Sequence, residues 1–344
     1  MEAEPEPSQP KQKKGFSTTA SWNYDSSNVP IHHLTFSKSS NEIAVSQWDG
    51  KVQILSAQTG RISYSIDTHQ ETIVSCSKFH PNSHGLILSC TTSGTVGIYR
   101  IADGICTWKT TEKTNNDGQI ENNNCYSCDI SSDASTFVVV GSDAIVRVYD
   151  AVNFKNIHTF SKDTPELNLY HTSRIYSSLY DPSNPAIIFT GGWDTRVLMW
   201  DLRSGQSVSS FGGPNLCGDS LDIDSRNNIL LTGSWRRKTP LEMWDIRTSQ
   251  VVEQGEWSSS LNQENDICQV YSAKFVKNPN NTIGNVVAGG SDCHNFKLFD
   301  TELKPTLRLG FFKETINSIA VSPDGQKIVA ASQDGKCQAF SYQV

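Results

Sequence analysis

The sequence predicts an all-β protein, a seven-bladed β-propeller, from three observations. A pattern of two short strands joined by a tight turn recurs seven times along the 344 residues. No long helical periodicity competes with this pattern. The intervals between the final aromatic or aliphatic residues of successive copies run from 41 to 55 residues. A repeat near this length that contains several short strands is typical of one propeller blade.

Each copy consists of a short apolar strand, a turn of small residues, and an alternating strand that ends on an aromatic or aliphatic residue. In chain order the copies are SQWDGKVQIL (46–55), TTSGTVGIY (91–99), GSDAIVRVYD (141–150), GGWDTRVLMWD (191–201), GSWRRKTPLEMWD (233–245), GGSDCHNFKLFD (289–300) and SQDGKCQAF (332–340).

The strands and turns follow from simple patterns. Val146 and Val148 alternate with Arg147 and Tyr149, which gives a strand with two different faces. Pairs such as Asp49-Gly50 in the turns favour tight hairpins. A single blade buries little apolar surface, so the blades must stack into a ring.

The two ends of the chain have different predicted roles. Residues 1–15 (MEAEPEPSQPKQKKG) contain no apolar run, and we expect a disordered tail followed by a single propeller domain over residues 16–344. Only four residues follow Phe340, too few for a fourth strand in the last blade. The segment Phe16 to Tyr24 is therefore predicted to complete that blade and close the ring.

Composition narrows the classes of partner. The net charge of −7 disfavours nucleic acid and anionic lipid, because the long-range field repels both. No apolar run approaches the roughly 18 residues of a membrane helix. The N-terminus has no apolar signal region, so we expect a cytoplasmic protein, with nuclear or cytoskeletal sites also compatible. The nine cysteines are then expected to be thiols.

Three short motifs carry a family resemblance. Trp200-Asp201 and Trp244-Asp245 close two of the copies, and Ser322-Pro323-Asp324-Gly325 lies in a third. Over about residues 20 to 344 the chain resembles the WD-repeat family, and this resemblance implies a seven-bladed β-propeller. In that family a His, a turn Asp and a terminal Trp form a buried hydrogen-bonded set within a blade. In the fourth copy His171, Asp194 and Trp200 match it, which implies a structural role.

The resemblance also implies which residues gather on one face, around the central channel. These are the residue before each turn Asp and the bulge residue of each innermost strand. The first kind includes Trp48, Trp193 and Trp235, and the second includes Tyr126, Tyr176 and Tyr271, with His32, Asp219 and Asn317 in other blades. Arg174, Arg236 and Arg237 lie beside them. Trp, Tyr and Arg dominate binding hot spots, so we predict a partner-binding surface. The alternative is that the indoles pack over neighbouring loops.

The run Trp235-Arg236-Arg237-Lys238 lengthens the turn of the fifth copy by two residues. Its adjacent cations suit a carboxylate or phosphate group of a partner, with Arg as a bidentate donor. A solvated turn explains the same residues, and the sequence leaves both interpretations open.

Two motifs suggest metal binding but do not complete a site. Cys125 and Cys128 lack a second ligand pair, and their spacing along a strand is expected to turn the two thiols to opposite faces. Asp292-Cys293-His294 is interpreted as a stretched turn. No catalytic motif is present, so we expect no enzyme activity, metal, cofactor or small-molecule substrate.

One run points to a particular class of partner. Residues 187–203 (IIFTGGWDTRVLMWDLR) are similar to the WDxR box through which some WD-repeat substrate receptors dock onto the adaptor of cullin-type ubiquitin ligases. Arg203 and Arg247 would be the docking cations. The function that we expect is a non-catalytic scaffold that binds peptide segments of proteins within a complex. Alternatives are a ligase substrate receptor, a checkpoint or messenger-export adaptor and, more distantly, a propeller hydrolase.

Overall fold

The computed structural model describes residues 15–68, 71–116, 119–164, 169–258, 267–277 and 283–343. The predicted tail, residues 1–15, lies almost wholly outside these ranges, so the boundary of the domain stays a prediction. All regular elements in the described ranges are strands. Within the same ranges there is no helix with the length and apolarity to cross a membrane.

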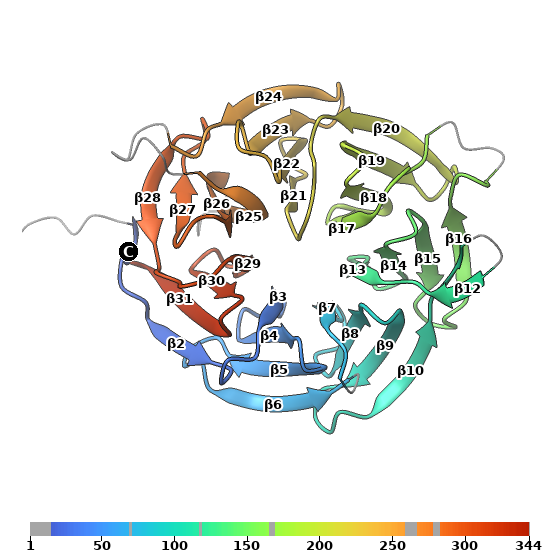
Figure 1. Ribbon diagram of the computed structural model, residues 1–344, viewed down its shortest axis with the longest axis horizontal. Coiled ribbons are helices and arrows are strands. Elements are labelled where there is room, and N and C mark those ends of the chain that lie inside the picture. Colours follow the sequence, from blue (N-terminus) through green and yellow to red (C-terminus); the bar gives the residue numbers. More distant parts are fainter. Residues whose placement is uncertain are drawn as a thin grey trace, which may run out of the picture.

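Seven antiparallel sheets form a ring around a central axis (Figure 1), which confirms the predicted seven-bladed β-propeller. The first three blades contain β3 (Ile31–Phe36), β4 (Glu42–Gln47), β5 (Lys51–Ser56) and β6 (Ile62–Asp67); β7 (Val74–Phe79), β8 (Leu86–Thr91), β9 (Thr95–Arg100) and β10 (Cys106–Thr111); and β13 (Cys125–Ile130), β14 (Thr136–Gly141), β15 (Val146–Asp150) and β16 (Asn156–Phe160).

The next three blades follow the same order from the axis outward. They contain β17 (Ile175–Asp181), β18 (Asn184–Gly192), β19 (Arg196–Asp201) and β20 (Gln206–Gly212); β21 (Leu221–Asp224), β22 (Ile229–Gly233), β23 (Leu241–Asp245) and β24 (Gln250–Gly255); and β25 (Gln269–Lys277), β26 (Ile283–Ser291), β27 (Phe296–Phe299) and β28 (Pro305–Leu309).

The seventh blade joins the two ends of the chain, as predicted. Its inner strands are β29 (Ile316–Val321), β30 (Lys327–Ser332) and β31 (Lys336–Gln343). The outer edge of β31 pairs with β1 (Gly15–Phe16) and with β2 (Trp22–Asp25), where Trp22 lies opposite Ala339. The Trp22 indole is buried and donates a hydrogen bond from Nε1 to the Ala57 carbonyl at 3.0 Å. The N-terminal segment therefore covers the edge that β31 would otherwise expose.

The seven sequence copies all fall on the same part of a blade. Each spans the turn between the second and third strands, as β4–β5 and β18–β19 illustrate. Five of the six residues expected at bulges of the innermost strands lie at such positions; the sixth, Asp219, precedes β21, whose pairing has no register shift. The register of the innermost strands shifts at His32, Tyr126, Tyr176, Tyr271 and Asn317. A bulge re-aims one side chain, which here turns toward the channel.

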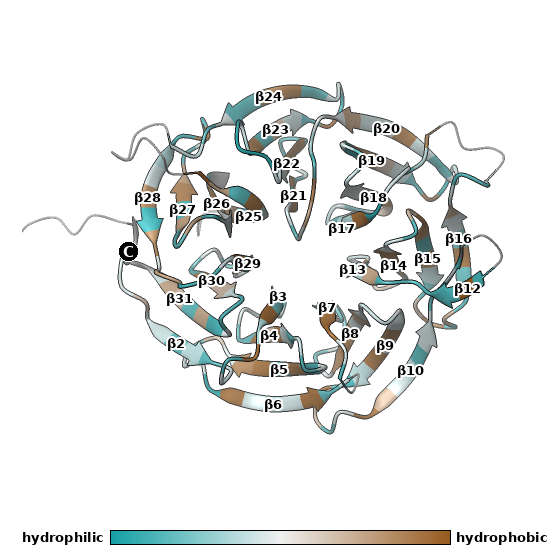
Figure 2. Ribbon diagram, in the orientation of Figure 1, coloured by the Kyte–Doolittle hydropathy of each residue, from teal (hydrophilic) through white to brown (hydrophobic). Residues whose placement is uncertain are grey.

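The core consists of seven apolar clusters, one between each pair of adjacent blades. A blade has apolar residues on both faces because it is packed from both sides. Toward the rim the strands alternate, and Figure 2 shows hydrophobic and hydrophilic bands along β31. The ring therefore depends on contacts between blades, as expected for a repeat protein.

The innermost strands are also linked by hydrogen bonds from one blade to the next. In several pairs of blades a backbone N–H of one strand donates to a polar side chain of its neighbour. These donors and acceptors are Leu34 and Ser318 (3.0 Å), Ser178 and Ser127 (3.2 Å), Tyr180 and Asp129 (2.8 Å), Phe275 and Asp222 (2.8 Å), and Ile319 and Ser272 (3.0 Å).

Two features differ from the sequence predictions. A two-stranded hairpin, β11 (Lys113–Asn116) with β12 (Gln119–Asn122), is inserted between the second and third blades. The expectation that Cys125 and Cys128 point to opposite faces is wrong, because both are fully buried in one cluster. The bulge at Tyr126 adds one residue to the strand and brings both thiols to the same side.

Candidate functional site

The fourth blade contains a buried hydrogen-bonded chain. His171 Nδ1 lies 2.8 Å from Asp194 Oδ2, and Nε2 lies 2.8 Å from Thr190 Oγ1. Trp200 Nε1 donates to the same Thr190 hydroxyl at 2.7 Å. The structure thus joins His171, Asp194 and Trp200 through a fourth residue that the sequence comparison did not single out. These hydrogen bonds link the set within the interior of the blade, which is consistent with the structural role that the resemblance implies.

The third blade uses different residues for the same purpose. Arg147 pairs with Asp143 at 2.6 Å and with Glu112 at 3.0 Å, and Tyr149 donates to Glu112. All four side chains are nearly inaccessible to solvent, with at most 10% of each charged side chain exposed. A buried charged network that includes the turn residue Asp143 has therefore replaced the His and the Trp of the fourth blade.

A cavity of about 260 Å³ opens at one mouth of the central channel. Its lining brings together four of the predicted partner-binding residues, Trp48, Tyr126, Tyr176 and Tyr271. They come from the first, third, fourth and sixth blades, so residues distant in sequence share one concave surface. Trp48 remains 37% exposed, which leaves its ring accessible to a partner.

Trp193 and Arg174 extend this surface over the fourth blade. The Tyr126 and Tyr176 rings stack at 4.5 Å, and Tyr176 contacts Trp193 at 5.6 Å between ring centroids. The Arg174 guanidinium lies 5.4 Å from the Trp193 ring, a cation–π contact. The Trp193 indole donates to Cys217 Sγ at 2.7 Å and is still 44% exposed. The aromatic surface is therefore fixed by internal contacts without being covered.

Trp235 joins the set from the fifth blade, where it interacts with the side chain of Tyr271. Its indole is 36% exposed. Burial raises the pKa of the Tyr271 phenol above its usual value, so this hydroxyl remains protonated at neutral pH. All three indoles are thus partly exposed at the surface.

The cations of the long fifth-blade turn are not equivalent. The Arg236 guanidinium lies 2.6 Å from buried Glu242 and donates to the Thr239 carbonyl at 2.9 Å and the Gly213 carbonyl at 3.3 Å. Its donors therefore hold the turn in place. Arg236 thus has a structural role in this turn. Of the three adjacent cations, only Arg237 and Lys238 are exposed and could contact an acidic group of a partner.

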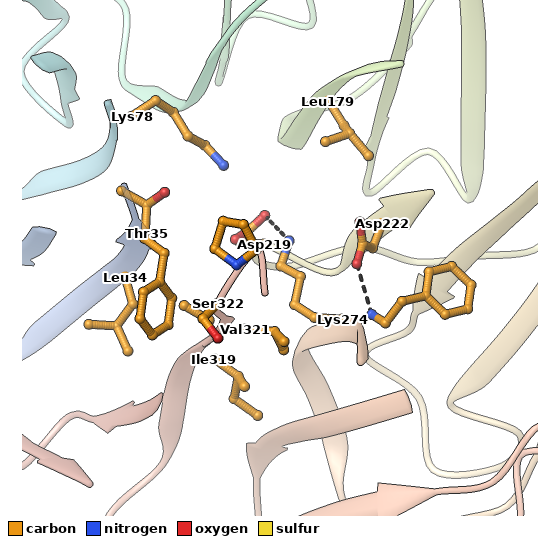
Figure 3. Close-up of a pocket in the computed structure, with 14 residues that line it drawn as sticks. Leu34, Thr35, Lys78, Leu179, Asp219, Asp222, Lys274, Ile319, Val321 and Ser322 are labelled. Carbon is orange, nitrogen blue, oxygen red and sulfur yellow. Dashed lines mark hydrogen bonds and ion pairs between the residues drawn. The ribbon is translucent and has the colours of Figure 1, made fainter. Parts of the chain in front are cut away.

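An ion cluster lies deeper in the channel, between the mouth cavity and a second cavity of about 270 Å³ (Figure 3). Asp219 lines both cavities and contacts Lys274 Nζ at 2.8 Å and His33 Nε2 at 3.2 Å. Lys78 extends into the second cavity from the second blade (Figure 3). Asp219 was expected at an exposed bulge position; that expectation is wrong, because its side chain is 16% exposed and paired.

The charges of this cluster depend on one another. Burial alone would raise the pKa of Asp219, but Lys274, Lys78 and His33 hold it well below its usual value. Burial would likewise lower the pKa of Lys78, and the Asp219 and Asp129 carboxylates outweigh that effect and raise it. In the described part of the chain no group of three or more His, Cys, Asp and Glu side chains could hold a metal ion.

Comparisons with known proteins agree with this geometry. The family model "WD domain, G-beta repeat" matches residues 164–201 and 305–341, and the model "Anaphase-promoting complex subunit 4 WD40 domain" matches residues 16–82. The first of these matches contains the buried set of the fourth blade. The matched segments are WD repeats, in agreement with the resemblance.

The relatives of this WD-repeat propeller are distant. It is 28% identical over 186 residues to a guanine nucleotide-binding protein subunit beta from Zea mays, covering 49% of this chain and 45% of the relative. It is 27% identical over 162 residues to autophagy-related protein 16 from Arabidopsis thaliana, covering 46% and 29%. It is 25% identical over 207 residues to eukaryotic translation initiation factor 3 subunit I from Drosophila ananassae, covering 58% and 62%.

The chain therefore spans less than half the length of the first of these relatives, and no subfamily is clear. Two of the three are named as subunits of larger assemblies. Together with the propeller fold, these similarities support a protein-interaction scaffold in general terms.

Arg203 and Arg247, the predicted adaptor-docking residues of the WD-repeat propeller, each fold back onto the Asp of their own motif. Arg203 donates to both oxygens of Asp201 at 2.9 and 2.7 Å, and Arg247 donates to Asp245 at 3.2 and 2.9 Å. The side chains remain 66% and 68% exposed. They present one planar guanidinium on each of two adjacent blades.

Sequence reasoning missed Cys217, Lys274 and Lys78. Cys217 lines the mouth cavity and fixes Trp193, while the two lysines belong to the ion cluster. They lie outside the motif copies, and their partners come from other blades. An Asp directly after Gly218, at a predicted bulge position held elsewhere by Tyr, His or Asn, was the only sequence signal for this cluster.

Proposed function

We propose that this WD-repeat propeller is a non-catalytic scaffold that binds peptide segments of partner proteins at the aromatic mouth of its channel. We call this surface the aromatic mouth; it consists of Trp48, Tyr126, Tyr176, Trp193, Trp235 and Tyr271. One observation carries the proposal: a cavity lined by Trp48 and by tyrosines from three blades is extended by the Trp193 ring, and both indoles are exposed, by 37% and 44%. Large rigid rings supply much contact area and lose little conformational entropy on binding.

The mechanism is preorganisation. The Tyr126–Tyr176 stack, the Tyr176–Trp193 contact and the Trp193–Cys217 hydrogen bond fix these rings before a partner arrives. Binding therefore orders few side chains of the propeller, which lowers its entropic cost. A cavity of about 260 Å³ fits one or two side chains of an extended segment.

Charge at the rim suggests the chemistry of the rest of the segment. Arg174 and Arg237 are exposed beside Trp193 and Trp235 on a protein whose net charge is −7. Guanidinium groups favour carboxylate and phosphate partners through paired hydrogen bonds. The proposed segment accordingly places an apolar or aromatic side chain in the cavity and an acidic group against the Arg174 rim.

Affinity capture from the native cell tests the proposal. The wild type is compared with a mouth variant that combines Trp48→Ala, Tyr176→Ala and Trp193→Ala. We expect partner proteins to be lost from the mouth variant while its circular dichroism spectrum is unchanged. Capture of the same set of proteins by both forms would contradict binding at the mouth.

A ligase substrate receptor is a subclass of this scaffold, and the exposed guanidinium groups of Arg203 and Arg247 favour it. The Arg203→Ala/Arg247→Ala variant tests it in the same capture. Selective loss of adaptor and cullin subunits would support this subclass, and retention of an adaptor by this variant would exclude docking through these two residues.

A further inference from the structure

Two buried thiols of the sixth blade lie next to each other. Cys268 precedes β25, and Cys293 lies in the turn between β26 and β27. Their Sγ atoms are 2.9 Å apart, and the two residues are 0% and 4% exposed. Neither sulfur belongs to a disulfide bond, so the pair is in the dithiol state. Sequence spacing did not suggest this contact, because 24 residues separate the two.

The surroundings of the pair are apolar. Both residues belong to the cluster between the fifth and sixth blades, with Trp257, Val270 and Phe299. Cys293 also donates from Sγ to the Gly290 carbonyl at 3.3 Å. Neither thiol belongs to the aromatic mouth or the channel ion cluster. Packing alone does not require two sulfur atoms here, since a single apolar side chain could fill the same space.

We propose that Cys268 and Cys293 form an oxidisable pair that closes to a cystine when the protein meets a peroxide. The thiolate of Cys293, the less buried thiol, attacks one oxygen of hydrogen peroxide; the O–O bond breaks, hydroxide leaves and a sulfenic acid forms. Cys268 sulfur then attacks the Cys293 sulfur, the S–O bond breaks and water leaves. Overall two thiols lose two electrons and two protons, and one peroxide becomes two waters.

Little movement is needed for this step. The sulfur atoms must approach by only about 0.9 Å to reach the length of a disulfide bond. The bond would join the residue before β25 to the turn that follows β26. Tyr271 of the aromatic mouth lies three residues after Cys268. The cystine would therefore fix the innermost strand of the sixth blade where it reaches the channel mouth, and it would restrict the unfolded chain.

The experiment uses the full-length protein, reduced and then treated with hydrogen peroxide. Remaining thiols are blocked with an alkylating agent in denaturant, and the peptides are mapped by mass spectrometry without reductant. We expect a linked peptide containing Cys268 and Cys293, with two of the nine thiols lost and both recovered after dithiothreitol. Full retention of the nine thiols, or a link among Cys76, Cys90 and Cys128 instead, would overturn the proposal.

Two variants serve as controls. Cys293→Ser should keep its remaining thiols under peroxide, whereas Cys106→Ser, which removes an exposed thiol, should still form the link. The wild-type measurement needs no variant, so a misfolded variant does not affect the result. The linked protein should melt at a higher temperature than the reduced protein. A lower melting temperature would show that the bond distorts the blade and would contradict the proposed fit.

Discussion

At the scale of single residues, the hydroxyl of Thr190 connects the two halves of the buried set in the fourth blade. With His171 Nδ1–H donating to Asp194, Nε2 accepts from Thr190, whose oxygen accepts from Trp200. Thr190→Val keeps the shape and removes both hydrogen bonds. We expect the free energy of unfolding to fall by about 3 kcal/mol, because two buried polar groups lose their partners. Urea denaturation of the wild type and the variant measures this difference in the free energy of unfolding.

The control for this variant is Thr107→Val, which removes an exposed hydroxyl bonded to the Ile98 carbonyl. Its effect should stay within about 0.5 kcal/mol. Equal effects of the two substitutions would show that the buried set contributes nothing beyond an ordinary surface hydrogen bond.

Asp219 is the residue on which the channel ion cluster depends. Asp219→Asn leaves Lys274 and Lys78 without their main counter-charge, so unfolding free energy should fall by about 3 kcal/mol at pH 7. Because the pKa of Asp219 is depressed in the folded state, its contribution is complete above the unfolded pKa near 4 and is lost as pH falls below it. Burial lowers the pKa of His33, but Cys76 and Asp219 outweigh it and raise this pKa, so His33 gains its proton next to Asp219 as pH falls from 7 to 5. The difference between wild type and variant should therefore grow over this range and should not shrink.

Denaturation of both proteins across this pH range provides the measurement. A difference that already shrinks between pH 7 and pH 5 would show that the carboxylate is not stabilised as the geometry indicates. A Lys297→Met variant, which alters a buried lysine outside the channel, controls for a general effect of losing a buried charge.

Residue-scale features were the least predictable from sequence. His171, Asp194 and Trp200 could be selected because their spacing follows a repeat. Thr190 could not, since a Thr within an apolar strand has no distinctive pattern. The contact between His33 and Asp219 joins residues 186 positions apart, and it exists only because the ring brings the first and fifth blades to one axis.

At the scale of elements, β2 carries the closure of the ring. Its Trp22 is 8% exposed and packs in the cluster between the seventh and first blades. Trp22→Ala should lower unfolding free energy by about 4 kcal/mol through lost burial and the cavity left behind. Trp48→Ala is the matched control, because the same residue type is 37% exposed there and its loss should change stability little.

Differential scanning calorimetry compares the two variants, and deletion of residues 16–24 should lower the melting temperature further. If Trp22→Ala melted like Trp48→Ala, β2 would not be needed to close the propeller.

Strands and hairpins were predicted correctly where they belong to the repeated sequence pattern. The turn of small residues, the alternating third strand and the final aromatic or aliphatic residue located the hairpin of every blade. The bulges were located by the same resemblance, but their effect on Cys125 and Cys128 was not, because strict alternation assumes an unbroken register. The hairpin of β11 and β12 was missed since it lies in a polar insertion between two copies.

At the scale of the whole molecule, the ring turns distant residues into one surface. Trp48 and Tyr271 are 223 positions apart and line the same cavity. The Trp, Tyr and Arg residues of the sequence led to the prediction of a partner-binding surface. The fold brings four of these residues together around one cavity. The internal pairing of Arg236 depends on Glu242 and could not be foreseen from the row of cations.

The dissociation constant of a purified partner segment, measured by isothermal titration calorimetry, tests the central claim most directly. The segment is the part of a captured protein that binds the wild type. The account predicts at least about 100-fold weaker binding to the Trp48→Ala/Tyr176→Ala/Trp193→Ala variant, since each hot-spot ring contributes about 2 kcal/mol. Binding to the Arg203→Ala/Arg247→Ala control should be unchanged. An unaltered dissociation constant for the mouth variant would contradict recognition at the aromatic mouth.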